Sequence, residues 1–266
     1  MTSPELPPQG RDARDALVSL HSEIGKAVVG QEGALTGLII ALVADGHVLL
    51  EGVPGVAKTL LVRTLARCID LTMTRVQFTP DLMPADITGS LVWDNGKSEF
   101  EFRPGPIFTN LLLADEINRT PPKTQSALLE AMEEHQVSVD GHTRPLASPF
   151  MVIATQNPVE YEGTYPLPEA QLDRFLLKLD LPLPSREDEF NILLRHQNGF
   201  NPLDLASADL HPVANASDIL TAREQAEHIE VSPAVLTYMV DLIRATRTSP
   251  AIRIGVSPRG ATALLR

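Results

Sequence analysis

The sequence predicts an α/β protein, with a mostly parallel sheet flanked by helices, two inserted β-hairpins and a small all-helical region at the end. Three observations carry this prediction. Short apolar segments, typical of buried strands, alternate with helical segments up to about residue 184. Two alternating segments with central Asn-Gly or Asp-Gly dipeptides interrupt that order. After residue 184 the pattern is helical throughout.

The alternating part follows a Pro-rich start, residues 1–12, that we expect to be a disordered tail. Thr120 is the expected N-cap of one helix and Pro121 its first helical residue. Apolar spacing predicts helices at 13–29, 31–46, 57–69 and 120–135, and strands at 47–52, 73–79, 111–115, 149–155 and 174–181. Residues 13–184 would form this α/β core.

The two hairpins are expected at residues 90–102 and 135–146. The first would turn at Asn95-Gly96 and the second at Asp140-Gly141, in the mirror-type turns that match strand twist. In the second, Val137 and Val139 share one face. The sequence leaves two interpretations open, ordinary surface hairpins or effector elements inserted into the core.

The last region, residues 185–266, is expected to be a small helical domain that is incomplete at its C-terminus. Four helical segments begin with a serine, at Ser185, Ser217, Ser232 and Ser257. In two of them proline follows the serine, which is typical of an N-cap followed by the first helical residue.

Composition excludes several classes of protein. The net charge of −12 repels phosphate backbones, so nucleic acid is not an expected partner. The single Cys68 cannot form an internal disulfide and is expected to be a buried apolar residue. The apolar run at 34–44 is too short to span a bilayer, and no signal peptide is evident. We therefore expect a cytoplasmic protein without an integral membrane segment.

A near match to a phosphate-binding loop, GVPGVAKT at 52–59, lies between the first strand and the next helix. Gly52 and Gly55 allow a tight turn whose N–H groups face phosphate oxygens. Lys58 can reach the β- and γ-phosphates, and the Thr59 hydroxyl can bind Mg²⁺. The general pattern has glycine where this chain has Ala57. We expect a negative φ there, because the helix begins at that position. The competing interpretation is a turn that contains a lysine by chance.

An acidic pair ends the buried strand LLLADE at 111–116. Asp115 can hold Mg²⁺ through water, and Glu116 can orient and deprotonate an attacking water. The alternative is solvated surface charge. Together with the loop, the pair predicts a nucleotide site more specifically than either motif does alone.

Three further polar residues follow or precede predicted elements. Asn157 ends another strand and could contact the γ-phosphate or the water, although Asn-Pro is also a common turn dipeptide. Arg174 precedes the last strand, a position that suits an arginine finger directed at a neighbouring subunit. Arg259 lies in the first turn of a helix, where a cation opposes the helix dipole and hints at a nearby anion.

Taken in order, GVPGVAKT, LLLADEINR, ATQNP, LPEAQLDRF and GVSPRG resemble the MoxR family of AAA+ ATPases over residues 13–266. That family also uses alanine at the position of Ala57. The resemblance implies an AAA+ core with a helical lid, ATP and Mg²⁺ at their junction, and a homo-oligomeric ring, commonly a hexamer. It implies ATP hydrolysis that drives chaperone-like maturation of protein clients, often with a von Willebrand factor A-domain protein.

The resemblance also implies residue roles. Lys58, Asn157 (sensor 1), Arg174 (arginine finger), Arg259 (sensor 2) and Glu116 would take part in catalysis. Thr59 and Asp115 would bind the metal. The expected nucleotide contacts are Val29, Gly30 and Gln31 at the adenine, then Gly52, Val53, Pro54, Gly55, Val56, Ala57, Lys58, Thr59, Leu60, Asp115 and Arg259.

Alternative functions remain open from sequence. One is a magnesium-chelatase-like ATPase subunit, and another is a nucleotide-gated interaction module with little turnover. A DNA-remodelling ATPase would need basic hairpins, whereas the first hairpin has Lys97 and Arg103 against three acidic residues. The histidines and the cysteine show no metal-ligand spacing, so no structural metal is expected.

Overall fold

A five-stranded parallel sheet forms the centre of the protein, as described in a computed structural model that covers residues 13–157 and 163–266. The expected tail at 1–12 lies outside these residues. The strand order is β2-β5-β8-β1-β9, and every neighbouring pair is parallel. The strands are β1 (Val48–Glu51), β2 (Met73–Gln77), β5 (Leu111–Asp115), β8 (Met151–Gln156) and β9 (Leu177–Asp180).

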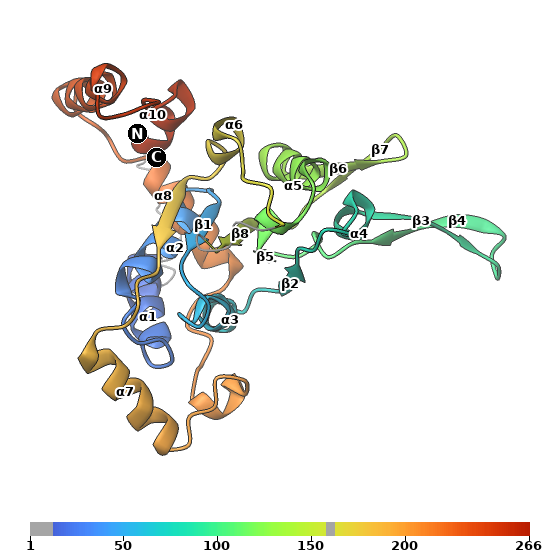
Figure 1. The fold of residues 1–266 in the computed structure, drawn as a ribbon, viewed down its shortest axis with the longest axis horizontal. Helices are drawn as coiled ribbons and strands as arrows, with labels where there is room; N and C mark the ends of the chain where they lie inside the picture. The colour runs from blue at the N-terminus through green and yellow to red at the C-terminus, as the bar shows by residue number, and fades with distance from the viewer. Residues whose placement is uncertain (1–12, 158–162) are drawn as a thin grey trace, which may run out of the picture.

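Helices cover both faces of this sheet, which confirms the predicted α/β class (Figure 1). Successive strand residues point to opposite faces, so Leu50 and Ile153 pack in one apolar cluster while Leu49 and Val152 pack in another. The first cluster involves α1 (Ala13–Gly25), α2 (Glu32–Val43) and α3 (Lys58–Ile69), and the second α4 (Pro84–Thr88) and α5 (Pro122–Glu134).

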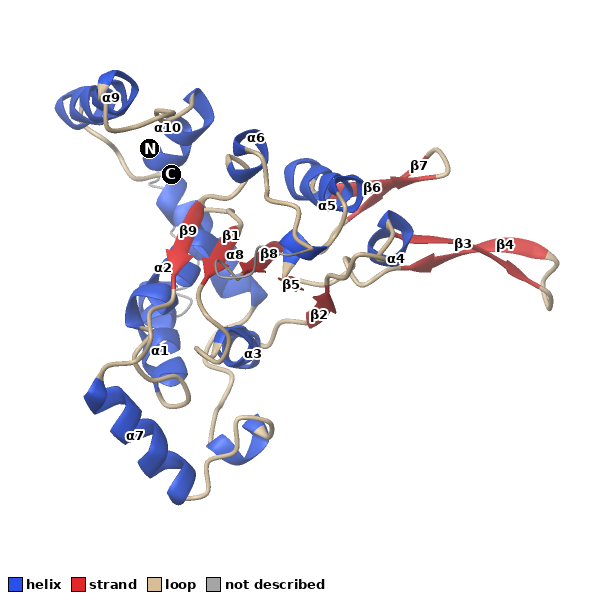
Figure 2. Cartoon of the chain, in the orientation of Figure 1, coloured by secondary structure: helices blue, strands red, loops and turns tan. Residues whose placement is uncertain are grey.

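Two hairpins project from this body, as Figure 2 shows in red. They are β3 (Gly89–Asp94) with β4 (Glu99–Pro104), and β6 (Gln136–Val139) with β7 (His142–Pro145). The mirror-type turn of the second is confirmed, because Asp140 and Gly141 have φ of 51° and 77°. Its Val137 is buried and Val139 half-buried.

The predicted turn of the first hairpin is wrong. Asp94 pairs with Glu99, so residues 95–98 form the loop, and Ser98 has the positive φ, 52°. The Gly96 N–H donates to Asp94 Oδ1 at 2.7 Å. This side-chain bond forms a local turn that competes with the two-residue loop.

Two predicted helix starts are also wrong. Pro122 is the first residue of α5 and Pro121 its extended N-cap, because a following proline disfavours helical geometry in the residue before it. Thr120 is instead buried before the helix. In α8 (Ala216–Glu227) the cap is Asn215, which accepts hydrogen bonds from the N–H groups of Ser217 and Asp218. The caps at Ser232 and Ser257 are confirmed, and Ser185 caps α7 as well.

The helices after residue 184 lie in three places (Figure 1). Helix α8 packs against α1 and α2, and Ile219 joins their apolar cluster. Helix α7 (Arg186–Gln197) lies on one side of the sheet, and α9 (Pro233–Thr248) with α10 (Pro258–Leu265) on the other. Shorter elements are η1 (Ile117–Arg119), α6 (Glu169–Leu172) and η2 (Leu205–Ala208). The division at residue 184 into core and helical domain stays a prediction.

Two further expectations were that Cys68 is buried and that no segment spans a membrane. Cys68 is fully buried, as expected, and burial raises the pKa of its thiol to about 12. The thiol therefore stays protonated and packs as an apolar group. Among the described residues, no helix combines the length and apolar character that crossing a bilayer requires.

Candidate nucleotide site

The parallel strands bring the phosphate loop, the acidic pair and Asn157 to one edge of the sheet. The loop follows β1, Asn157 follows β8 and the acidic pair ends β5. Strand β8 lies between the other two, so the ends of β1 and β5 are two strand spacings apart, about 10 Å. We name this the carboxyl edge. Lys58, Asp115, Glu116 and Asn157 therefore lie together, as the sequence predicts.

The loop at 52–59 folds around its own lysine. Lys58 Nζ donates to the carbonyl oxygen of Gly52 at 2.7 Å, so the side chain folds back over the turn. A Cβ at Gly52 would come within 2.9 Å of the Leu181 carbonyl oxygen, so only glycine fits there. Gly55 has a φ of 90°, and Val56 is buried. Gly52 and Val56 thus anchor the loop to the core, whereas Pro54 and Gly55 at its tip are exposed.

The expectation of a negative φ at Ala57 is wrong. Ala57 has a φ of 66° and is the N-cap of α3, which begins at Lys58. The loop must reverse direction before the helix starts, and that reversal requires left-handed geometry. This geometry is the reason that the general pattern has glycine there, since alanine pays about 1–2 kcal/mol for it.

The acidic pair is anchored by Thr155 on β8. The Thr155 hydroxyl donates to Asp115 Oδ1 at 2.6 Å, and the Glu116 N–H donates to the same hydroxyl oxygen at 2.9 Å. Asp115 is buried, with 9% of its surface exposed. Glu116 has a left-handed φ of 57°, which turns its side chain out of the line of the strand. The two carboxylates thus have separate orientations.

Strand β2 contributes two residues that the sequence analysis missed. Arg75 contacts Asp115 Oδ2 at 2.6 Å, and Gln77 Nε2 donates to Glu116 Oε2 at 2.6 Å. Arg119 also contacts Glu116 Oε2, at 3.2 Å. The alternation of β2 puts positions 75 and 77 on one face. That pattern was visible in the sequence, but the pairing of β2 with β5 was not.

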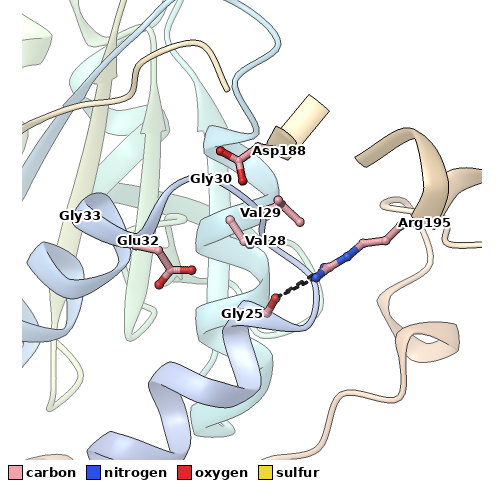
Figure 3. A pocket seen from close by; sticks show the side chains of 8 residues that line it. All are labelled: Gly25, Val28, Val29, Gly30, Glu32, Gly33, Asp188 and Arg195. Atoms are coloured by element: carbon pink, nitrogen blue, oxygen red, sulfur yellow. Dashed lines mark hydrogen bonds between the residues drawn. The ribbon is translucent and has the colours of Figure 1, made fainter. Parts of the chain in front are cut away.

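The expected adenine segment also lies at the carboxyl edge. Gln31 Nε2 donates to the Pro182 carbonyl at 3.0 Å, and the neighbouring Leu181 contacts Gly52 of the loop. Val29 and Gly30 line a cavity of about 400 Å³ beside this junction (Figure 3). The cavity is lined by residues on either side of Gln31, and Gln31 itself is bonded to the segment that follows β9.

The two expected arginines lie together at the opposite edge. Arg174 Nε contacts Glu133 Oε2 at 3.0 Å, and Arg259 Nη1 contacts Glu133 Oε1 at 3.2 Å. Glu133 lies in the last turn of α5, where the carbonyl oxygen of the neighbouring Met132 accepts a hydrogen bond from the His47 ring. His47 immediately precedes β1, so this is the edge where the strands begin. We name it the amino edge.

Burial and bonding explain the state of His47. Its Nδ1 accepts from the Val152 N–H at 3.0 Å, so the proton lies on Nε2, which donates to the Met132 carbonyl. Burial lowers the pKa of His47 to about 4. The ring is therefore neutral at pH 7 and links β8 to α5.

Within one chain, Arg259 and the phosphate loop do not meet. A nucleotide bound between the core and the last helices, as expected from the sequence, would require Arg259 and the phosphate loop to lie at the same edge of the sheet. Strand β1 separates them, and its four residues span roughly 13 Å. Neither arginine is positioned at the nucleotide of its own chain.

The oxygen donors at the carboxyl edge fit Mg²⁺. Thr59 supplies a hydroxyl and Asp115 a carboxylate, the hard oxygen ligands that Mg²⁺ prefers. Both Asp115 oxygens have polar partners, Thr155 and Arg75, so the carboxylate is oriented, and a cation would replace Arg75 at Oδ2. No group of three or more His, Cys, Asp or Glu residues suited to a metal occurs in the described part of the chain.

These features define a class of protein, the P-loop nucleotide-binding proteins in which one strand lies between the strand that precedes the loop and the strand that ends in the acidic pair. Comparisons with known proteins agree. Residues 47–177 match the family described as ATPase family associated with various cellular activities (AAA). The chain is 42% identical to Chaperone MoxR1 of Mycobacterium tuberculosis, over 98% of this chain and 71% of that protein. It is 36% identical to Protein MoxR of Methylorubrum extorquens, over 96% and 79%.

A solved structure is similar as well. The crystal structure of a putative ATPase from Cytophaga hutchinsonii is 44% identical and superposes with a TM-score of 0.84, covering 95% of this chain and 78% of that one. The chain therefore belongs to the MoxR family of AAA+ ATPases.

Proposed function

We propose that the chain hydrolyses ATP with Mg²⁺ and works as a homo-oligomeric ring, a hexamer, that remodels or matures protein clients. The observation that carries this proposal is the split of the site between the two edges. The carboxyl edge holds the phosphate loop and the acidic pair. The amino edge holds Arg174 and Arg259 on one carboxylate.

At the carboxyl edge, the roles follow from chemistry and position. The N–H groups of residues 53–60 and the Lys58 amine would hold the phosphates, and Thr59 and Asp115 would hold Mg²⁺. When bound, Mg²⁺ neutralises phosphate charge. Glu116 accepts a proton from the attacking water, oriented by Gln77 and Arg119 on its Oε2 atom. Asn157, buried between the two motifs, would position that water or the γ-phosphate.

At the amino edge, Arg174 and Arg259 would act on the nucleotide of a neighbouring copy. A head-to-tail interface that joins the amino edge of one copy to the carboxyl edge of the next closes into a ring. Arg174 is then an arginine finger. Arg259, expected from sequence to contact the nucleotide of its own chain, is proposed to act on the neighbour as well.

Protein clients suit the hairpins better than nucleic acid does. Trp93 and Phe100 stack edge-on across the first hairpin, 5.1 Å apart, and both are exposed. Lys97 lies 3.3 Å from Glu101, so its charge is neutralised. Exposed aromatic rings on a hairpin whose acidic residues outnumber its basic ones support binding of protein clients. The family resemblance supports a von Willebrand factor A-domain partner and a cytoplasmic location.

The test compares wild type with Glu116→Gln and Lys58→Ala. Glu116→Gln keeps the phosphate loop and loses the base, so we expect ATP binding near the wild-type level and phosphate release lower by roughly 10² to 10⁴. Lys58→Ala should lose binding. Glu227→Gln, an exposed carboxylate on α8, is the matched control and should leave both unchanged. Phosphate release by wild type no faster than by Lys58→Ala would contradict the proposal.

A further inference from the structure

Glu133 lies between two arginines that come from different parts of the chain. Arg174 follows α6, and Arg259 lies at the start of α10, far along the chain. Arg174 Nε contacts Oε2 of the Glu133 carboxylate, and Arg259 Nη1 contacts Oε1. Each carboxylate oxygen therefore binds a different guanidinium. Through this carboxylate, α5 is joined both to the residue that follows α6 and to α10, on the same side of the sheet (Figure 1).

The charges of this cluster do not suit their own helices. Glu133 lies in the last turn of α5, near the partial negative charge of the helix, and Arg259 lies in the first turn of α10, near the partial positive charge. Each placement is unfavourable alone, and contact between the two side chains offsets both. Ion pairs as exposed as these contribute little to stability, so the placement indicates a role other than holding the helices.

A second contact fixes the start of α10 beside this cluster. Ser257 is the N-cap of α10, and its hydroxyl donates to Asp173 Oδ1 at 2.8 Å. Asp173 immediately precedes Arg174, and Ser257 precedes Arg259 by two residues. The two contacts together therefore keep Arg259 next to Arg174.

Both guanidiniums retain donors that Glu133 does not use. Arg174 Nη1 donates to the carbonyl oxygen of Ala170 at 3.2 Å. Among residues 13–157 and 163–266, the Nη2 atoms of Arg174 and Arg259 make no hydrogen bond. A guanidinium has five N–H donors in a rigid fork, so each arginine can contact a phosphate oxygen while it is still bonded to Glu133.

From this geometry we infer that Glu133 is a positioning residue for ATP hydrolysis, which holds Arg174 and Arg259 side by side for the phosphates of a neighbouring copy. The inference rests on the proposed function, since it concerns the amino-edge half of the same site. Two adjacent guanidiniums repel each other, and the carboxylate between them offsets that repulsion. The phosphates of a neighbour then meet two arginines that are already ordered, which removes the entropic cost of ordering each one during the reaction.

Glu133→Gln tests this role, because it removes the charge and keeps the shape. The amide has one oxygen that accepts and one nitrogen that donates, so it can hold one arginine while its NH₂ group repels the other. We expect phosphate release to fall by about 10- to 100-fold, as for a group misplaced by about 1 Å. The Kd for ATP should stay unchanged, because the phosphate loop lies at the other edge. Glu133→Asp keeps the charge and should lose less.

The matched control is Glu134→Gln, one residue further along the same helix. Glu134 is exposed, and its carboxylate makes no hydrogen bond or ion pair with the part of the chain that the structure describes. This variant should keep the wild-type rate. It separates the contact with the arginines from the general effect of a negative charge at the end of α5.

Mixtures of variants show whether Glu133 acts through the arginines. A Glu133→Gln copy retains its phosphate loop and a Lys58→Ala copy retains its ordered arginines, so their mixture should recover part of the rate. A mixture of Glu133→Gln with Arg174→Ala should not recover, because every copy is then defective at the amino edge. A variant that merely fails to fold or to assemble would recover in neither mixture.

Three results overturn the inference alone. They are a wild-type rate in Glu133→Gln, a faster rate in that variant, and no recovery with Lys58→Ala where Arg174→Ala does recover. If neither variant recovers with Lys58→Ala, the inference and the proposed ring fail together. A wild type that releases phosphate no faster than Lys58→Ala overturns the inference and the whole proposed function.

Discussion

The two edges of one sheet differ in their chemistry. The carboxyl edge carries the phosphate loop and the acidic pair, the residues proposed to hold phosphates and Mg²⁺ and to accept a proton. The amino edge carries two arginines that meet on Glu133, beside the buried His47. Backbone geometry produces this separation, because parallel strands all begin at one edge and end at the other.

Under the proposed function, a single chain holds only part of the hydrolysis site, because its two arginines lie at the other edge. Arginines stabilise charge on a transferring phosphoryl group when they contact it. Here they bind a carboxylate instead, roughly one strand length from the loop. In an assembled ring, the phosphates of a neighbour would compete with Glu133 for them.

Arg174→Ala should produce the largest effect, a loss of roughly 10³-fold or more in phosphate release with ATP binding retained. The variant removes the amino-edge group and leaves the carboxyl edge intact. Mixing it with Lys58→Ala should restore part of the rate, since each copy supplies what its neighbour lacks. Arg253→Ala removes an exposed arginine that pairs with Glu169 and serves as the control. A mixture that never exceeds the sum of its parts would show that Arg174 does not act between copies.

Arg259→Ala should have a smaller effect, a loss of about 10²-fold, as for removal of one donor to a transition state. Its mixture with Lys58→Ala decides which nucleotide it serves. If Arg259 acts on the neighbour, an Arg259→Ala copy receives the missing arginine from a Lys58→Ala copy and the rate recovers. Absence of recovery, with recovery for Arg174→Ala, would place Arg259 at its own nucleotide.

His47 should make the stability of the amino edge depend on pH. Its pKa falls from 6.5 to about 4 on folding, so between these values the unfolded chain binds more protons. This contribution is complete above pH 6.5 and is lost as pH falls toward 4, by roughly 3 kcal/mol. Denaturant midpoints at pH 7 and 5 should differ less in His47→Asn than in wild type and in the exposed control His196→Asn. Equal pH dependence in all three would contradict the assignment.

Ala57→Gly should give the smallest effect, a gain of up to about 1 kcal/mol in the free energy of unfolding. Glycine relieves the left-handed strain at the N-cap of α3. Ala66→Gly, within the same helix, should destabilise by about that amount or more, because its helical φ gains nothing from glycine. A destabilised Ala57→Gly would contradict the left-handed geometry.

Local motifs explain the predictions that succeeded. The loop at 52–59 and the pair at 115–116 each lie on a strand end, and their chemistry depends on neighbours within a few residues. The predictions that failed depended on competition between neighbours. Pro122 moved the start of α5, the Asn215 cap began α8 ahead of Ser217, and the Asp94 side chain widened the first hairpin turn.

By itself the sequence determined the family, the parallel α/β class and the chemistry of the carboxyl edge, because strand and helix periodicity and the phosphate loop are short-range patterns. Only the tertiary structure decided which distant residues meet. Gln77 reaches Glu116 across paired strands, Asp188 lines a cavity beside Gly30 from a helix far along the chain, and Glu133 holds two arginines at the opposite edge. Such contacts depend on strand order and helix packing, which no local pattern encodes.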